Sequence, residues 1–111
     1  MALQIIQVNF NFHSTVEEFE NTANAVAPVF AQLEGLIWKT WLINREKKEA
    51  GGIYLFASEQ AVENYKTSVI FSRMNYNPNY YNLTVKQFDI VEVASLITNA
   101  PVGLQVRTAL N

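Results

Sequence analysis

The residues Glu49-Ala50-Gly51-Gly52-Ile53-Tyr54-Leu55-Phe56 (EAGGIYLF) decide the fold of this chain. A charged turn, residues 45–49, leads into them, and the aromatic run LIWKTW, residues 36–41, precedes that turn. Two apolar runs on either side of a polar turn are typical of a β-hairpin. We therefore expect strands over 36–44 and 51–57. A hairpin that carries two Trp, a Tyr and a Phe forms either a packed sheet core or the wall of an apolar pocket.

The chain before the hairpin begins with a strand. Residues 3–12 alternate between apolar and polar side chains, which is the period of a β-strand. One face carries Ile6, Val8, Phe10 and Phe12, and the other carries Gln7, Asn9 and Asn11.

Two helices are predicted by their starting residues and their apolar spacing. Ser14 and Glu17 have the spacing of a capping box, and apolar residues then recur at intervals of three and four as far as Gly35. Pro28 lies inside this segment and is expected to kink the helix or remove a hydrogen bond. Ser58 can cap a second helix. That helix should end in a loop over 75–82, where Asn, Pro and three tyrosines gather.

A last strand over 83–93 completes the order β-α-β-β-α-β. This order is that of the α+β ferredoxin-like fold, a four-stranded antiparallel sheet with two helices on one face. Residues 1–99 form the single domain, and residues 100–111 are expected to be an arm that packs on its own subunit or on a partner. The uncovered aromatic face of the sheet predicts a homodimer that packs sheet against sheet.

The composition excludes several classes of protein. With 111 residues the chain has the length of one domain. A net charge of −2, with 16% charged residues, does not fit a nucleic-acid-binding surface. No apolar run reaches the ~18 residues of a membrane span, and the N-terminus lacks the pattern of a signal peptide. We therefore expect a cytoplasmic protein with neither a nucleic-acid nor a membrane partner.

Metal sites and nucleophilic sites are also disfavoured. The chain has no cysteine and one histidine, His13, so no metal site is expected. No serine lies in a Gly-x-Ser-x-Gly motif. The pair Gly51-Gly52 opens a strand and not a helix, which excludes a phosphate-binding loop. We expect these two glycines at a hairpin end or a bulge that needs an unusual φ.

Several motifs together resemble one family. They are Phe10-Asn11-Phe12, Pro28, Gly35, Trp38-Lys39-x-Trp41, the EAGGIYLF stretch and Phe88-Asp89-Ile90. With them the chain resembles the YdhR-like mono-oxygenases, which belong to the dimeric α+β-barrel superfamily together with the antibiotic-biosynthesis mono-oxygenases. The resemblance extends to about Asn99. It implies a homodimer, a pocket between sheet and helices in each subunit, and mono-oxygenase activity.

The resemblance to the haem-degrading branch of that superfamily is weaker. Gln7 and Phe56 stand where that branch has an Asn and a Trp, and the second helix has no His to ligate haem iron. We therefore expect no cofactor.

Chemistry without a cofactor needs few protein groups. An electron-rich substrate such as a hydroquinone or an anthrone, once deprotonated, donates an electron to O₂ itself. The protein supplies a dry pocket, a hydrogen bond to the enolate or phenolate, and a proton acceptor. The candidate catalytic residues are Asn9, Tyr54 and His13, with Lys39 as a further possible proton acceptor. The candidate substrate-binding residues are Gln7, Asn11, Trp38, Lys39, Trp41, Phe56 and Tyr65.

The sequence leaves three functions open. The first is a cofactor-independent mono-oxygenase that oxidises a small aromatic or polyketide-like substrate in an apolar pocket. The second is a non-catalytic dimeric module of the same fold that binds a small apolar ligand, and the third is a dimer whose cavity is filled by side chains. Trp38 and Trp41 are three residues apart and should point to opposite faces, whereas Tyr54 and Phe56 share one face. Lys39 is expected to extend to solvent, with a cation–π contact or a ligand anion as alternatives.

Overall fold

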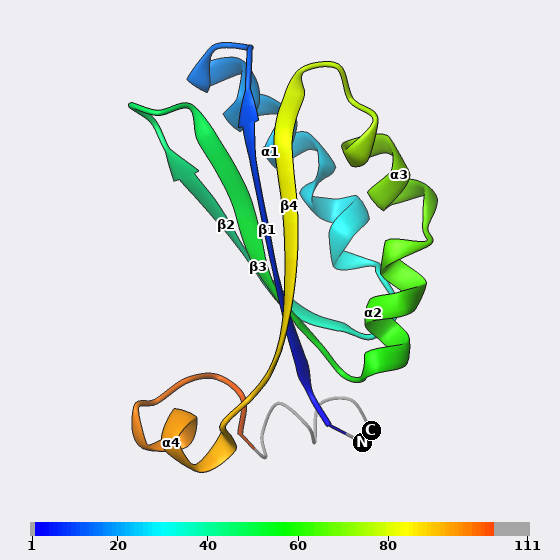
Figure 1. The fold of residues 1–111 in the computed structure, drawn as a ribbon, viewed down its shortest axis with the longest axis vertical. Coiled ribbons are helices and arrows are strands. Elements are labelled where there is room, and N and C mark those ends of the chain that lie inside the picture. Colours follow the sequence, from blue (N-terminus) through cyan, green and yellow to red (C-terminus); the bar gives the residue numbers. More distant parts are fainter. Residues whose placement is uncertain (1, 104–111) are drawn as a thin grey trace.

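A computed structural model describes residues 2–103 and confirms the ferredoxin-like fold. The sheet is antiparallel, with the strand order β2-β3-β1-β4. The elements are β1 (Gln4–Phe12), α1 (Val16–Ala31), β2 (Leu36–Asn44), β3 (Glu49–Phe56), α2 (Glu59–Lys66), α3 (Val69–Asn75), β4 (Tyr80–Asp89) and α4 (Glu92–Ile97). Helices α1, α2 and α3 cover one face of the sheet, whereas α4 lies apart from them at one end of the molecule (Figure 1).

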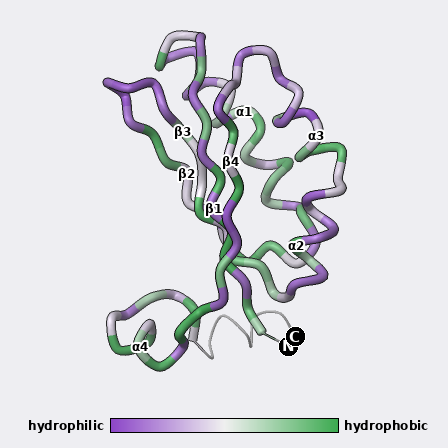
Figure 2. Tube along the Cα trace, viewed as in Figure 1, coloured by the Kyte–Doolittle hydropathy of each residue, from purple (hydrophilic) through white to green (hydrophobic). Residues whose placement is uncertain are grey.

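The core lies between the sheet and these three helices. The apolar residues of β1 alternate as the sequence predicts, and Ile6, Val8, Phe10 and Phe12 are all buried in it. Figure 2 shows how apolar and polar positions mix along the strands, as expected where one face packs and the other does not. We call the side of the sheet away from α1, α2 and α3 the open face.

Helix α1 begins one residue later than predicted. Its capping box consists of Thr15 and Glu18, and the Thr15 hydroxyl accepts a hydrogen bond from the Glu18 N–H at 3.1 Å. Ser14 instead donates its N–H to the Asn79 side-chain oxygen at 2.8 Å, which ties the β1–α1 turn to the start of β4. The helix continues past Pro28 to Ala31.

The second helical segment differs more from the prediction, because it consists of two short helices. Ser68 separates them, since its hydroxyl bonds the Tyr65 carbonyl at 2.6 Å and accepts the Phe71 N–H at 3.2 Å. A serine that bonds nearby backbone in this way competes with helix continuation. The predicted loop over 75–82 is also shorter, because Tyr80 and Tyr81 already belong to β4.

The described part of the C-terminal arm packs on its own subunit. Val102 is buried against Leu3 and Leu55 on the open face. The Trp38 indole N–H donates to the Pro101 carbonyl at 3.1 Å. The prediction for residues 104–111 concerns positions outside the described residues.

The two adjacent glycines do not have the unusual backbone that we expected. They lie inside β3, and within residues 2–103 Gly35 is the glycine with a positive φ. Their role is close approach: a Cβ at Gly51 would lie 1.9 Å from the Val8 carbonyl oxygen, and one at Gly52 would lie 2.7 Å from Lys39 Cε. The absence of a Cβ thus leaves room for the backbone of β1 at Gly51 and for the side chain of Lys39 at Gly52.

This difference predicts unequal costs for two neighbouring substitutions. Gly51→Ala should lower the free energy of unfolding by about 3 kcal/mol, because rigid backbone has to move. Gly52→Ala should cost about 1 kcal/mol, because the Lys39 stem can move instead. Urea denaturation of both variants measures the two values, and equal losses would contradict this account.

Candidate functional site

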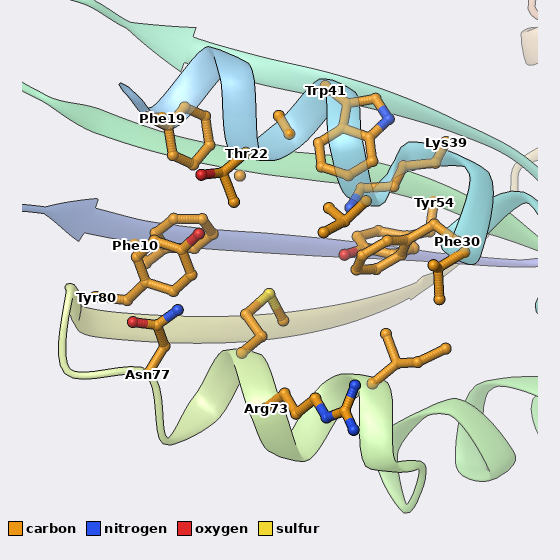
Figure 3. A pocket seen from close by; sticks show the side chains of 16 residues that line it. Phe10, Phe19, Thr22, Phe30, Lys39, Trp41, Tyr54, Arg73, Asn77 and Tyr80 are labelled. Atoms are coloured by element: carbon orange, nitrogen blue, oxygen red, sulfur yellow. The ribbon is translucent and has the colours of Figure 1, made fainter. Parts of the chain in front are cut away.

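A cavity of about 190 Å³ lies between the sheet and helices α1 and α3. Figure 3 shows aromatic rings from α1, β1, β2, β3 and β4 around it. Its lining residues are Phe10, Phe19, Thr22, Ala23, Val26, Val29, Phe30, Lys39, Trp41, Gly51, Tyr54, Ile70, Arg73, Met74, Asn77 and Tyr80. The cavity is not filled by side chains, so it offers space for a small molecule.

Lys39 projects from β2 into an aromatic cage in this cavity. Its Nζ lies 3.4 Å from the ring centroid of Trp41, 3.6 Å from that of Phe30 and 4.5 Å from that of Tyr54. The expectation that this side chain extends to solvent is therefore wrong, and the cation–π alternative is the one that the structure contains. Burial lowers the pKa of the Lys39 amine to about 7. At neutral pH the amine thus exists in both its charged and neutral forms, which suits a group that exchanges a proton.

A pair of buried tyrosines lies beside this amine. The hydroxyl oxygens of Tyr54 and Tyr65 are 3.0 Å apart and share a hydrogen bond. Burial raises the pKa of Tyr65 to about 12 and raises the pKa of Tyr54 further, with the neighbouring phenol adding to the shift of Tyr54. Both phenols therefore remain protonated at neutral pH, so Tyr54 can donate a hydrogen bond but cannot act as a base.

Polar groups from α1, α3 and β4 lie around the rest of the cavity. Thr22, Asn77 and Tyr80 gather at the end that is walled by Phe10 and Phe19, away from Lys39 (Figure 3). An amine at one end and neutral hydrogen-bonding groups at the other would orient an elongated ligand.

Helix α3 contributes lining residues that the sequence analysis missed. Ile70, Arg73 and Met74 have the spacing of one helix face, and this spacing is the signal that could have identified them. The sequence predicts this segment as the continuation of one helix. The break at Ser68 changes which of its residues face the sheet.

Three of the predicted site residues line the cavity, namely Lys39, Trp41 and Tyr54. Phe56 and Tyr65 are buried behind them, with their rings 5.9 Å and 5.2 Å from that of Tyr54. They support the cavity wall without lining it. Trp38 lies on the open face, where it packs with Leu55 and Val102, so Trp41 is the tryptophan of the cavity.

The remaining predicted residues do not reach the cavity. Gln7, Asn9 and Asn11 lie on the open face, where Gln7 donates to the Asn9 side-chain oxygen at 2.9 Å. Asn11 instead accepts from Asn82 at 3.3 Å. His13 is exposed and stacks on Tyr81 with ring centroids 4.5 Å apart. In the single subunit, these groups are separated from Lys39 by the sheet or by the length of β1.

Within residues 2–103, no three His, Cys, Asp or Glu side chains come together in a group that could hold a metal ion. In the same part of the chain, no helix is long and apolar enough to cross a membrane.

Comparison with known families identifies the chain. The model of the family described as "Putative mono-oxygenase ydhR" matches residues 5–101. The chain belongs to the YdhR family. This match spans nearly all of the described residues and confirms the resemblance found in the sequence. No relative was found among curated proteins.

Solved structures share the fold of this YdhR-family chain at low sequence identity. SnoaB, a cofactor-independent oxygenase from Streptomyces nogalater, is 17% identical, with a TM-score of 0.67 over 83% of this chain and 96% of SnoaB. Protein SO0527 from Shewanella oneidensis is 10% identical, with a TM-score of 0.67 over 80% of this chain and 91% of its own. A candidate antibiotic-biosynthesis mono-oxygenase from Bacillus cereus is 15% identical, with a TM-score of 0.58 over 83% and 96%. At these identities the likeness shows the fold alone.

The low pKa of Lys39 makes a prediction about stability. Above pH 7 the folded protein releases the Lys39 proton, whereas the unfolded chain keeps it until about pH 10. The unfolded state then binds more protons, so the free energy of unfolding should rise with pH. Relative to Lys39→Met, the wild type should gain about 2 kcal/mol between pH 7 and pH 9 in urea denaturation.

The matched control for this prediction is Lys47→Met, which removes an exposed lysine from the turn between β2 and β3. This variant should keep the pH dependence of the wild type. If Lys39→Met also keeps it, Lys39 does not release its proton in this range.

Proposed function

We propose that this protein is a cofactor-independent mono-oxygenase that oxidises a small, electron-rich aromatic substrate in the cavity around Lys39. The observation that carries the proposal is the amine itself, with a pKa of about 7 inside a largely aromatic cavity. Membership of the YdhR family supports an oxygenase, and the fold shared with SnoaB, a cofactor-independent oxygenase, is consistent with it.

The size of the cavity favours one or two fused rings. A cavity of roughly 150 Å³ lined by apolar side chains accommodates benzene, and the cavity here is about 190 Å³. A larger polyketide-like substrate would extend beyond this volume. We therefore assign the substrate to the small aromatic class, such as a naphthol.

Lys39 would act first, as the proton acceptor. Its neutral amine takes the phenolic proton, and the phenolate passes one electron to O₂ to give a phenoxyl radical and superoxide. The two combine at a ring carbon as a peroxide. Cleavage of the O–O bond leaves one oxygen on the ring as a carbonyl and releases the other as water. Overall, a naphthol and O₂ give a naphthoquinone and water, and the ring C–H and the phenol supply both hydrogens of the water.

The other lining groups have supporting roles in this scheme. The Lys39 ammonium, once formed, stabilises the phenolate beside it. Tyr54 supplies a ring wall and a hydroxyl that stays protonated. Asn9 and His13, the candidates from the sequence, would take part only if a second subunit brought them to a cavity.

Oxygen uptake with a panel of naphthols and hydroquinones tests the proposal. We expect incorporation of one atom of ¹⁸O from ¹⁸O₂ into the product, and a kcat/KM that rises from pH 6 to pH 8 as Lys39 becomes neutral. Lys39→Met should lower kcat/KM at least about 100-fold, as expected for the loss of a general base. Tyr54→Phe keeps the ring and should cost much less.

Further outcomes distinguish this mechanism from the alternative mechanisms and functions. His13→Ala should leave turnover unchanged, and a loss equal to that of Lys39→Met would move the base to His13. Tight binding of the panel with no oxygen uptake would contradict the enzyme and support a non-catalytic ligand-binding module. Release of hydrogen peroxide without ¹⁸O in the product would indicate simple oxidation of the substrate.

We also propose that two copies pair through the open face of the sheet. Part of this face is covered by Val102, but Ile53 and the three amides of β1 are only half-buried, and Phe88 is 49% exposed. A half-buried row of amides beside apolar groups fits a surface that a second copy covers.

Light scattering after gel filtration tests the pairing. The wild type should have twice the mass of one chain. Ile53→Asp, which places a charge on the open face opposite Gln7, should shift the protein to the mass of one chain. A monomeric wild type would contradict the proposal.

A further inference from the structure

The charged residues that line the cavity have one sign. Lys39 and Arg73 are the charged side chains among the described lining residues, and no Asp or Glu lines the cavity with them. They come from opposite walls, Lys39 from β2 and Arg73 from α3 (Figure 3). Lys39 is half-buried in the aromatic cage, whereas Arg73 is exposed at the edge of the cavity, so a ligand in the cavity would meet one cation inside it and a second at its edge.

Neither cation has a carboxylate partner in the described part of the chain. The ion pairs found there join Arg45 to Glu20 and Lys66 to Glu63, both outside this cavity. An exposed Arg45 therefore has a bidentate partner, whereas the more buried Lys39 has none. A half-buried cation without a counter-ion either loses its proton or gains from a bound anion, so an anionic ligand would stabilise the charged form of Lys39.

We infer that the cavity binds its aromatic ligand as an anion, and that an acidic oxygen of the ligand takes the place of the missing carboxylate at Lys39 and Arg73. The aromatic rings around Lys39 would hold the apolar body of the ligand, and the two cations would select an acidic group on it. This inference rests on the proposed function, since it names the substrate class for the same cavity.

The protonation state of Lys39 gives ligand binding a measurable consequence. With a pKa of about 7, about a tenth of the amines carry a proton at pH 8. A bound carboxylate favours the ammonium, so binding at pH 8 should draw a proton from solution. At pH 6 the amine is already charged, and the uptake should be small.

The other titratable groups around Lys39 do not mimic this effect. Tyr54 on β3, Tyr65 on α2 and Tyr80 on β4 all have pKa values raised by burial. They stay protonated at pH 6 to 8 and exchange no proton there.

Calorimetric titration with 2-naphthoate and 2-naphthamide tests the inference without any turnover. The two probes have nearly the same shape and differ in charge. We expect naphthoate to bind at least tenfold more tightly. Its proton uptake, measured at pH 8 in two buffers of different ionisation enthalpy, should approach one per ligand and fall towards zero at pH 6.

Three variants complete the experiment. Lys39→Met should abolish both the tenfold preference and the proton uptake, whereas Arg73→Gln should weaken naphthoate severalfold and keep the uptake. Lys47→Met removes an exposed lysine from the turn between β2 and β3, outside the cavity, and should change neither. Circular dichroism shows whether each variant is folded.

The inference is overturned if naphthamide binds as tightly as naphthoate, if naphthoate does not bind at millimolar concentration, or if the uptake persists in Lys39→Met. Its failure and that of the oxygenase proposal are distinguishable. Selective, proton-linked binding with no oxygen uptake would leave the anion site standing. Turnover of neutral substrates without such binding would leave the oxygenase standing.

Discussion

One extra residue in β2 determines which side chains reach the cavity. Leu36 pairs with Phe56, but the next pair in the register is Trp38 with Leu55, so Ile37 is left over as a bulge. A bulge changes the phase of a strand from that point on. Leu36 and Lys39 therefore both face the helices, although an odd number of positions, three, lies from one to the other. Without this bulge, Lys39 and Trp41 would point to the open face and the cavity would lose its amine and its indole.

The cavity places an amine that can carry a charge among apolar aromatic rings, and these two properties normally conflict. An ammonium group is costly to bury, and this cost is what lowers the pKa of Lys39. Three ring faces offset part of the cost, because their negative π-clouds attract a cation. Gly52 contributes because it has no side chain, since a Cβ there would lie too close to Lys39 Cε. The EAGGIYLF stretch thus supplies Tyr54 as a wall of the cage and the gap next to it. Its two glycines have an ordinary strand conformation, and what matters is that they carry no side chain.

The sequence predicted the fold more completely than the site, for reasons that individual residues show. The alternation along β1 predicted Ile6, Val8, Phe10 and Phe12 as core, because period and burial follow directly from strand geometry. Which of Trp38 and Trp41 faces the cavity depends on the bulge in β2. This bulge can be located only when the pairing register of β2 with β3 is known. Asn9 was correctly placed on the strand face opposite the core, but the alternation of β1 alone does not reveal on which side of the sheet the cavity lies. The contribution of α3 depended on a break at Ser68 that helical periodicity does not reveal.

The opposite placement of the two tryptophans has a spectroscopic consequence. Trp41 lies against the Lys39 ammonium in the cavity, whereas the Trp38 indole is hydrogen-bonded to Pro101 on the far side of the sheet. The fluorescence of the chain is therefore the sum of two independent reporters. One senses the charge and contents of the cavity, and the other senses whether residues 100–103 stay docked. Replacing either indole by phenylalanine would isolate the signal of the other, so one short strand lets events on the two faces of the sheet be followed separately.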